Sequence, residues 1–383
     1  MDILSVLQAP AVGLLDYLFY FLSLLIALTV IVFIHEYGHF KVARLCGVKV
    51  DIFSVGFGRE IWGWTDSYQT RWKIGWLPLG GYVKFAGDAN AASMPDRDAV
   101  KRPTQPGDFH ATAVWKRALI VVAGPVANFI LAAFLFIGAF YILGDQVPGT
   151  VVGQVQAGSP AEQAGIQTGD VIKSINGQHT ESFDDIVKIV STRPGETLSV
   201  VVDRSGADLT LSVVARSDIE DRGFYGKATV GRIGVIASRD AANFRTLTFG
   251  ESIRAGVKQV WFIVDTTFRY IGKLFTGRDS VEHIGGLGSI AKATGDAASA
   301  GIFPFLSMIG FLSVSIGLIN LFPIPMLDGG HLVFYAIEAI RRRPLGENAQ
   351  EWGFRIGFAV VLFLMFIGNW NDLVKVIRQN VAL

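Results

Sequence analysis

The 383-residue chain has few cysteines and few charged residues, and both shortages limit what it can be. Cys46 is its only cysteine, which excludes an intrachain disulfide and a structural zinc site built from cysteine thiolates. Charged residues make up 17% of the chain, against about a quarter in an average soluble protein, while 51% of the residues are hydrophobic. Because the formal net charge is only +1, we expect no nucleic-acid partner. The composition instead predicts a protein that is partly embedded in the lipid bilayer.

The first sixteen residues contain no lysine or arginine, and carry Asp2 and Asp16 instead. A cleaved signal peptide begins with a basic region, so this segment does not have the expected pattern. We therefore expect the first apolar run to remain in the protein as a membrane helix.

Four uncharged runs reach or approach the ~17–25 apolar residues that a helix needs to cross a bilayer. They comprise residues 17–34, 118–144, 297–327 and 356–371. The last run is the shortest, and it needs its flanks, where Trp352 and Trp370 suit the aromatic belt at the membrane interface. The pattern predicts a polytopic α-helical membrane protein with four transmembrane helices. We expect them at about 17–39, 118–144, 300–322 and 352–371.

Basic residues in the connections predict the orientation, because cytoplasmic loops are enriched in lysine and arginine. Residues 41–117 hold twelve Lys/Arg against seven Asp/Glu, and the last connection contains Arg341, Arg342 and Arg343. Residues 145–300 hold sixteen basic and eighteen acidic residues. We expect the first two regions in the cytoplasm, and both termini and the long insertion outside it.

A metal-binding motif lies at the end of the first apolar run, where His35, Glu36 and His39 form HExxH. Histidines four residues apart share one helix face and can hold one Zn²⁺, while the glutamate can act as general base. The alternative is a pair of structural histidines with a capping glutamate. Because ionisable groups within a bilayer are costly and usually functional, we favour the zinc site.

The third apolar run ends in a second unusual motif, with Pro323 and Pro325 followed by Asp328. The prolines break the helix and free its backbone, and an aspartate at membrane depth needs a cation. Two histidines leave a zinc ion short of a third protein ligand, and Asp328 fits that position. Asp328 could also cap the helix that follows, and both roles are compatible. His331 is a rival ligand, but we expect it within that helix, behind the ligands.

The two motifs occur together in one known family. HExxH at the end of a first transmembrane helix, followed far downstream by NxxPxPxLDG at 320–329, resembles the site-2 proteases, the intramembrane zinc metallopeptidases. The resemblance is strongest to their bacterial RseP-like branch. GxxxN at 124–128 and Gly-Phe-Gly at 56–58 are similar to further elements of that family.

The resemblance implies a zinc endopeptidase in the bacterial inner membrane. Zn²⁺ would be the cofactor, held by His35, His39 and Asp328, with Glu36 as the general base. The substrates would be single-pass transmembrane proteins already cleaved on the extracytoplasmic side, such as an anti-sigma factor, or remnant signal peptides. Two other classes stay open, a catalytically inactive membrane scaffold and a transporter that places His, Glu and Asp in the bilayer.

The resemblance also implies that Asn128 and Asn320 position the substrate backbone or the oxyanion. For Asn128 there is a structural alternative. Gly124 permits a close helix contact, and Asn128 could hydrogen-bond across it.

Residues 50–85 alternate aromatic, glycine and charged positions, which predicts strands joined by glycine turns. Non-helical backbone at membrane depth must pack against protein or line a wet cavity, so we expect a reentrant, membrane-associated β segment beside the catalytic helix. Its edge could pair with an unwound substrate. The candidate edge residues are Tyr82, Val83, Lys84 and Phe85. The alternative is a cytosolic hairpin that only braces the fold.

Residues 146–235 read as a soluble insertion, and the stretch at 157–177 resembles a bacterial PDZ domain. We expect a short helix after Ser159, a strand at 171–175 and a longer helix at 183–190 beside a groove. PDZ domains bind an extended chain end by strand addition. The weaker candidates for the carboxylate loop are Gly231, Arg232, Ile233 and Gly234. Alternatively, the domain only excludes bulky substrates. RseP has two tandem PDZ domains, and one is visible here.

The remaining segments complete the organisation. Residues 1–144 and 297–383 form the two halves of the protease core, and 236–296 form a connector. Within the connector, 250–275 has the period of an amphipathic helix that lies on the outer membrane surface. We do not expect His283 to be a ligand, because it would stand outside the membrane.

Overall fold

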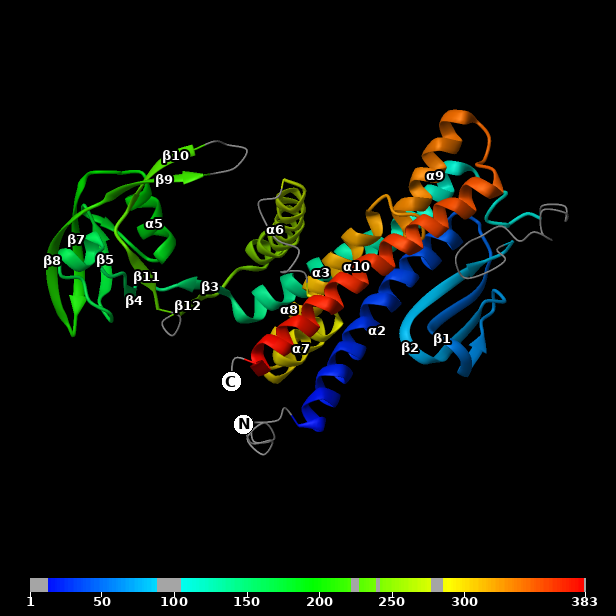
Figure 1. The fold of residues 1–383 in the computed structure, drawn as a ribbon, viewed down its shortest axis with the longest axis horizontal. Helices are drawn as coiled ribbons and strands as arrows, with labels where there is room; N and C mark the ends of the chain where they lie inside the picture. Colours follow the sequence, from blue (N-terminus) through cyan, green and yellow to red (C-terminus); the bar gives the residue numbers. More distant parts are fainter. Residues whose placement is uncertain (1–12, 88–104, 222–226, 239–241, 277–284, 382–383) are drawn as a thin grey trace. The chain divides into compact units, whose positions relative to one another are not determined.

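The computed structural model describes residues 13–87, 105–221, 227–238, 242–276 and 285–381. It contains two compact units (Figure 1). The first combines Met1–Ala139 with Glu251–Leu383, and the second is Phe140–Gly250.

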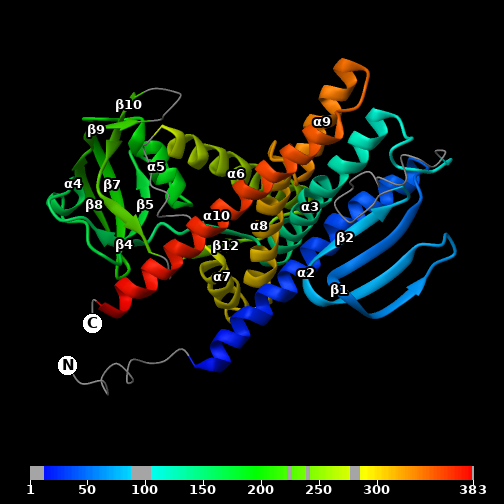
Figure 2. The same ribbon diagram turned by 45° about the vertical axis from the view of Figure 1, so that its right-hand side comes forward.

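Four helices of the described residues are long and apolar enough to cross a membrane: α2 (Leu14–Leu45), α3 (Val114–Leu143), α8 (Ile302–Leu321) and α10 (Glu347–Val381). Each contains one of the four predicted apolar runs or most of it, so four candidate spans are confirmed. Figures 1 and 2 both show the axes of α2 and α10 roughly aligned, with the chain running in opposite directions along the two helices. Large apolar side chains of α10 stay exposed, which suits a helix surrounded by lipid. They include Phe358, Leu362, Phe363 and Phe366.

Helices α3 and α8 are packed closely through small and polar residues. A Cβ added at Gly317 of α8 would lie 3.1 Å from Asn128 Cβ and 3.1 Å from the Pro125 carbonyl oxygen. Ser313 Oγ donates a hydrogen bond of 2.9 Å to the Asn128 carbonyl. Small residues and interhelical hydrogen bonds are the usual means of holding membrane helices together. Pro125 lies inside α3, and the helix continues through it.

The proline motif ends α8 and starts α9 (Asp328–Arg341) after a tight turn. Met326 has φ of +87°, in the left-handed region that residues other than glycine rarely adopt. A Cβ at Gly330 would lie 2.5 Å from the Ile324 carbonyl oxygen, and one at Gly357 of α10 would overlap the Pro325 carbonyl. The glycines therefore let α9 and α10 close tightly around the turn, which fixes Asp328 as the first residue of α9.

Strands β1 (Val50–Thr65) and β2 (Arg71–Phe85) confirm the strands predicted at residues 50–85, whereas their reentrant placement in the membrane stays a prediction. Ile52 pairs with both Lys84 and Arg71, so the first part of β1 has a partner on each edge. The second part of β1 folds back on residues 71–75 of β2. Residues 81–85 therefore lie at one edge, paired only with β1 among the described strands.

Helix α6 (Phe249–Phe275) contacts α3 and the end of α8 within the first unit. A Cβ at Gly256 would lie 2.5 Å from Ile137 Cγ1 of α3, and the Phe268 ring lies 6.1 Å from the Phe322 ring at the end of α8. Its location on the outer membrane surface stays a prediction.

Helix α7 (Leu287–Ser299) is held at its N-terminus by side chains of α10. Asp372 accepts from the Ser289 N–H at 2.9 Å, and Asn369 accepts from the Leu287 N–H at 3.2 Å. These bonds satisfy backbone donors that a helix start leaves open. His283 lies outside the described residues.

The second unit is mainly β structure. A four-stranded sheet has the order β6 (Gln178–His179), β5 (Val171–Ile175), β7 (Thr197–Arg204), β8 (Ala207–Val214). Three antiparallel pairs accompany it: β3 (Asp145–Pro148) with β12 (Ala242–Arg245), β4 (Val152–Val155) with β11 (Val235–Ala237), and β9 (Arg216–Asp221) with β10 (Lys227–Arg232).

Two helices of this unit lie where the sequence predicts them. Helix α4 (Pro160–Gln163) is capped by Ser159, and α5 (Phe183–Ser191) begins with a capping box of Ser182 and Asp185. Ile186 of α5 packs on a core of aliphatic side chains from the sheet, among them Ile172, Ile175, Leu198, Val200 and Val202, and Ala161 of α4 belongs to the same core. The predicted strand at 171–175 is β5, so the local pattern of a short helix, a strand and a longer helix is confirmed.

Candidate active site

Three candidate metal ligands converge between α2 and α9. The two imidazole nitrogens His35 Nε2 and His39 Nε2 lie 3.1 Å apart. Asp328 Oδ2 lies 3.1 Å from His35 Nε2 and 3.5 Å from His39 Nε2. The ligand atoms of all three residues fall within 4.8 Å of one another. Spacing by four residues places both histidines on one face of α2, and the turn after α8 brings the aspartate to them.

The donor set fits a divalent cation. Asp328 Oδ2 is buried without a hydrogen-bond partner among the residues that the structure describes, which is costly for a carboxylate unless a positive charge lies beside it. Two imidazole nitrogens and one carboxylate oxygen are the ligands of the known catalytic zinc sites of His₂-carboxylate type. The aspartate and both histidines are also largely shielded from solvent.

A glycine of α3 makes room for the two histidines. A Cβ at Gly124 would overlap His39 Nε2 and lie 2.9 Å from His35 Nε2. On the opposite helix, a Cβ at Gly38 would overlap the Ala123 carbonyl oxygen. The pair of glycines therefore allows α2 and α3 to cross at backbone contact, directly at the candidate ligands.

The Nδ1 atoms of both imidazoles, on the side of the ring away from Asp328, contact polar groups of α3. His39 Nδ1 lies 2.9 Å from the Ile120 carbonyl oxygen, an acceptor, so Nδ1 carries the proton and Nε2 keeps its lone pair. His35 Nδ1 lies 3.2 Å from the Asn128 side-chain amide. Such contacts behind a ligand fix its ring orientation and tautomer.

A cavity of about 680 Å³ opens beside the three ligands. Glu36, His331 and Asn320 line it together with the strand edge. Its walls come from α2, the end of α8, the start of α9 and residues 80–83 and 85 of β2, with further contributions from Phe57, Val121, Met326, Leu327 and Val361.

The predicted substrate-facing residues separate into two groups. Asn320, Tyr82, Val83 and Phe85 line the cavity, whereas Lys84 and Asn128 are not among its lining residues. Asn128 is fully buried and contacts His35 instead. This placement favours the alternative in which Asn128 hydrogen-bonds across a close helix contact.

An ion pair that sequence reasoning missed ties α3 to α9. Arg117 Nη2 lies 2.6 Å from Glu338 Oε1, and both side chains are largely buried. The Arg117 guanidinium also lies 5.0 Å from the centre of the Tyr335 ring. The contact therefore joins α3 to the helix that begins with Asp328. An arginine at the start of an apolar run was the only signal in the sequence.

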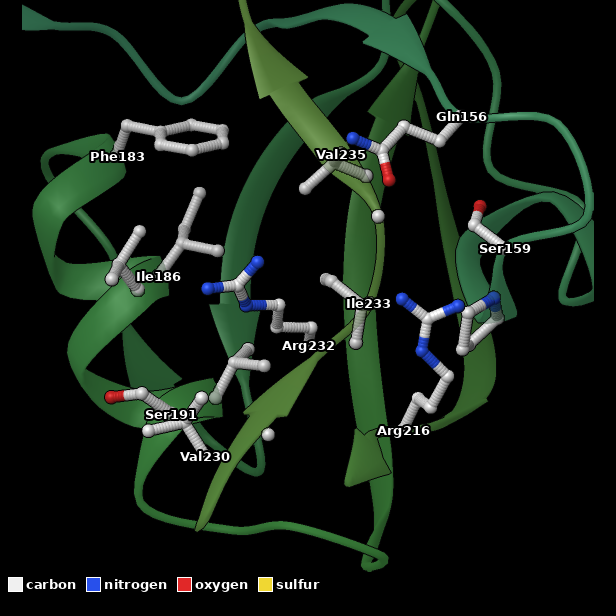
Figure 3. Close-up of a pocket in the computed structure, with 15 residues that line it drawn as sticks. Gln156, Ser159, Phe183, Ile186, Ser191, Arg216, Val230, Arg232, Ile233 and Val235 are labelled. Carbon is white, nitrogen blue, oxygen red and sulfur yellow. The ribbon is translucent and has the colours of Figure 1, made fainter. Parts of the chain in front are cut away.

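The second unit has a groove of its own, of about 390 Å³, between α5 and the segment 230–235 (Figure 3). All four predicted loop residues line it, namely Gly231, Arg232, Ile233 and Gly234.

Comparison with known proteins extends over nearly the whole chain. A family model described as peptidase family M50 matches residues 23–364, which include the histidines, the aspartate, the whole second and third candidate spans and part of the first and fourth.

The matches to curated relatives also extend over nearly the whole chain. A candidate zinc metalloprotease of Agrobacterium fabrum is 43% identical over 94% of this chain and 96% of its own length. One of Rhizobium meliloti is 45% identical over 92% of this chain and 95% of its own. The metalloprotease MmpA of Caulobacter vibrioides is 39% identical over 94% of this chain and 96% of its own.

Among solved structures, the PDZ domain of an SdrC-like protein from Listeria monocytogenes covers 25% of this chain and 94% of that chain, with 18% identity and a TM-score of 0.21. Its counterpart from Listeria innocua covers 23% of this chain and 92% of that chain, with 23% identity and a TM-score of 0.18.

Proposed function

The chain belongs to peptidase family M50, the site-2 proteases, and from that premise we propose that it hydrolyses peptide bonds within or near the transmembrane segments of single-pass membrane proteins. One observation carries the proposal: three candidate metal ligands and Glu36 border a cavity whose wall includes an open strand edge. A metal, a base and a backbone-binding edge are the parts that hydrolysis of an unwound segment requires.

Zinc is the proposed cofactor, since relatives of this chain are named zinc metalloproteases. His35 Nε2, His39 Nε2 and Asp328 would hold it, with the proton of His39 kept on Nδ1 by the Ile120 carbonyl. Zinc bound there supplies a Lewis acid that polarises a peptide carbonyl and activates water for attack.

Glu36 is the proposed general base. It follows His35 on α2 and lines the cavity, so its carboxylate lies within the space that water and peptide would share. The carboxylate takes a proton from the attacking water and later delivers it to the leaving amine. This two-step transfer leaves Glu36 unchanged after each cleavage.

The edge of β2 is the proposed binding site for the substrate backbone. A helical substrate hides its carbonyls, so it must unwind, and the freed groups need new partners within the membrane. Residues 81–85 lie close to the catalytic turn of α2, because a Cβ at Gly81 would lie 3.3 Å from Glu36 Cγ. An unwound segment added at this edge would run past Glu36. In the alternative, the β segment only braces α2.

Asn320 is the better candidate for a contact to the substrate, because it lines the cavity. Asn128 instead orients a ligand. Asn128 Nδ2 faces His35 Nδ1 in the structure, and Asn128 Oδ1 is buried without a partner among the described residues. If the amide is turned over, Oδ1 accepts a hydrogen bond from His35 Nδ1–H, which leaves the lone pair of Nε2 for the metal. Asn128 thus acts on the reaction through His35.

The proposed membrane orientation follows from the distribution of basic residues in the connections. We place the protein in the bacterial cytoplasmic membrane with both termini outside, and with a reentrant β segment open to the cytoplasmic side. The second unit is then an extracytoplasmic PDZ domain, which is supported by its order of elements and by the groove beside α5. It receives substrates already cleaved outside the membrane, or else excludes those that remain bulky.

The test compares membranes of cells that carry the wild-type protein with membranes of cells that carry Glu36→Gln. Single-pass proteins should accumulate uncut with the variant, and their cleavage sites should map within or next to their apolar segments. If no membrane protein differs between the two strains, or if the sites lie in soluble domains, the proposed function is wrong.

A further inference from the structure

A basic pocket of about 580 Å³ lies at the C-terminal end of α2, apart from the cavity of the candidate active site. Its charged lining residues are all cations, namely Lys41, Arg44 and Lys49. The other lining residues come from the turn after α2, the start of β1 and the turn between β1 and β2. Figures 1 and 2 both show these two strands beside the C-terminal part of α2. The pocket is therefore built from several segments of the first unit.

Arg44 is fixed in this pocket by four contacts. Its Nη2 donates hydrogen bonds of 2.5 Å to Asp66 Oδ2 and of 2.9 Å to Thr70 Oγ1. The guanidinium carbon lies 4.4 Å from the centre of the Phe40 ring and 4.4 Å from the centre of the Tyr68 ring. Because both hydrogen bonds use Nη2, Nε and Nη1 keep N–H groups that have no acceptor in the described part of the chain. Arg44 is thus a preorganised donor.

The two lysines of the pocket are exposed and carry charges that the protein does not balance. Within the described ranges, no carboxylate forms an ion pair with the ammonium group of Lys41 or Lys49. The charge of Arg44 is balanced by Asp66, which does not itself line the pocket. Two positive charges therefore remain in excess. Cations gathered in one pocket repel each other, and a bound anion relieves that repulsion.

The end of α2 does not oppose an anion as an open helix C-terminus would. The last carbonyl groups of a helix carry a partial negative charge when they lack partners. Here the Cys46 N–H donates to the Val42 carbonyl and the Val48 N–H donates to the Ala43 carbonyl, each at 2.9 Å. The turn after α2 therefore compensates the carbonyl groups beside the pocket.

An exposed apolar stripe of α2 leads to the pocket. Its members recur every three or four residues, and they are Leu22, Ile26, Val30, Phe33 and Tyr37. Lys41 lies four residues after the last of them, on the same helix face, and Leu45 follows one turn later in the lining of the pocket. Helix α2 is a candidate membrane span, so this stripe is suited to contact acyl chains. A soluble anion would leave the stripe uncovered.

We propose that the basic pocket binds the phosphate of an acidic glycerophospholipid, in the leaflet at the C-terminal end of α2. The phosphate lies between Lys41 and Lys49 and accepts hydrogen bonds from Arg44, while the acyl chains follow the apolar stripe. Basic pockets at the membrane surface recognise acidic head groups through such contacts. The inference rests on the proposed insertion of α2 in the bilayer, and on no step of proteolysis. The lipid would anchor the helix that carries His35 and His39.

Native mass spectrometry of the full-length protein in detergent tests the proposal, because it counts bound lipids and gives the dissociation constant of the first one. The probes are phosphatidylglycerol, which has a net negative charge, and phosphatidylethanolamine with the same acyl chains, which is neutral overall. The wild-type protein should bind phosphatidylglycerol about tenfold more tightly. Millimolar inorganic phosphate or glycerol 3-phosphate should not displace it, since neither has acyl chains to cover the stripe.

Variants assign the lipid preference to the pocket. Lys41→Gln and Lys49→Gln should each weaken binding of phosphatidylglycerol about fivefold, the effect of one basic residue near the membrane surface, and leave phosphatidylethanolamine unchanged. Both lysines are exposed, so neither change should disturb folding, and unchanged zinc content checks this. Arg343→Gln is the matched control, because Arg343 is an exposed cation on the same predicted side of the membrane and does not line the pocket.

Three results would overturn the inference: equal affinity of the wild-type protein for the two lipids, displacement of phosphatidylglycerol by either soluble phosphate, or the same loss in Arg343→Gln as in the lysine variants. None of them depends on catalysis. A protein that shows the lipid preference but cleaves no membrane protein would count against the proposed function alone.

Discussion

Gly124 of α3 and His39 of α2 touch so closely that a Cβ on the glycine would overlap His39 Nε2. The missing side chain is therefore part of the candidate metal site, although glycine itself binds nothing. In the GxxxN motif, Gly124 packs against the Nε2 atoms of His35 and His39, and Asn128 contacts Nδ1 of His35.

Gly124→Ala should displace the histidines and lower zinc affinity at least about tenfold, because overpacking at a fixed backbone contact moves the ligands. Chelator competition on the purified protein measures this. Gly138→Ala is the control on the same helix, where a Cβ would meet nothing within 4 Å. Equal zinc affinity in both variants would contradict the geometry.

Asn128→Ala should weaken zinc binding about 10–100-fold, as expected for loss of a group that orients a ligand. Asn128→Asp keeps an acceptor for His35 Nδ1–H and should restore much of the affinity. If Asn128 contacted only the substrate, both variants would hold zinc normally and change KM.

Glu36→Gln should retain zinc and lose cleavage by about 10²–10⁴-fold, because the amide cannot take a proton from water. His35→Ala and Asp328→Ala should lose zinc as well as activity. Metal analysis beside a cleavage assay separates the two effects, and full activity of Glu36→Gln would exclude it as the base.

Proline substitutions at Tyr82, Val83, Lys84 and Phe85 should each reduce cleavage with zinc content intact, since proline removes a backbone N–H from the strand. Lys84→Ala is the matched control, because Lys84 does not line the cavity and alanine keeps the N–H. Unchanged cleavage in all four proline variants, with normal folding, would favour a bracing role.

The second unit should lose stability in acid through Asp170. Two hydrogen bonds of 2.8 Å from the Arg204 guanidinium hold the pKa of this buried carboxyl below its usual value of 3.8. A lowered folded-state pKa stabilises the unit above the unfolded value, and the stability is lost as pH falls through the folded value. In hydrogen exchange of the full chain, the protection of this unit's amides relative to their intrinsic exchange rates should therefore decrease below about pH 4. Asp170→Asn should remove that pH dependence.

The sequence predicted the features that depend on local pattern. The spacing of His35 and His39, the apolar runs, and the proline turn before Asp328 all encode their structure over a few residues. The short helix, strand and long helix of the second unit follow from caps and periodicity in the same way.

Contacts between distant segments were not predictable from one sequence. The burial of Asn128 behind His35 depends on where α3 crosses α2, and the Arg117–Glu338 pair joins residues 221 positions apart. The alternating aromatic and glycine pattern predicts a strand, but it does not indicate that Ile52 pairs on both edges. The partners of a strand depend on the packing of the whole fold.

X-ray absorption at the zinc edge of the purified wild-type protein tests the central claim most directly. The account predicts one zinc per chain with two histidine nitrogens and a carboxylate oxygen at about 2.0–2.2 Å, and its loss in Asp328→Ala. A protein without tightly bound metal under any condition, or zinc whose surroundings do not change in Asp328→Ala, would contradict it.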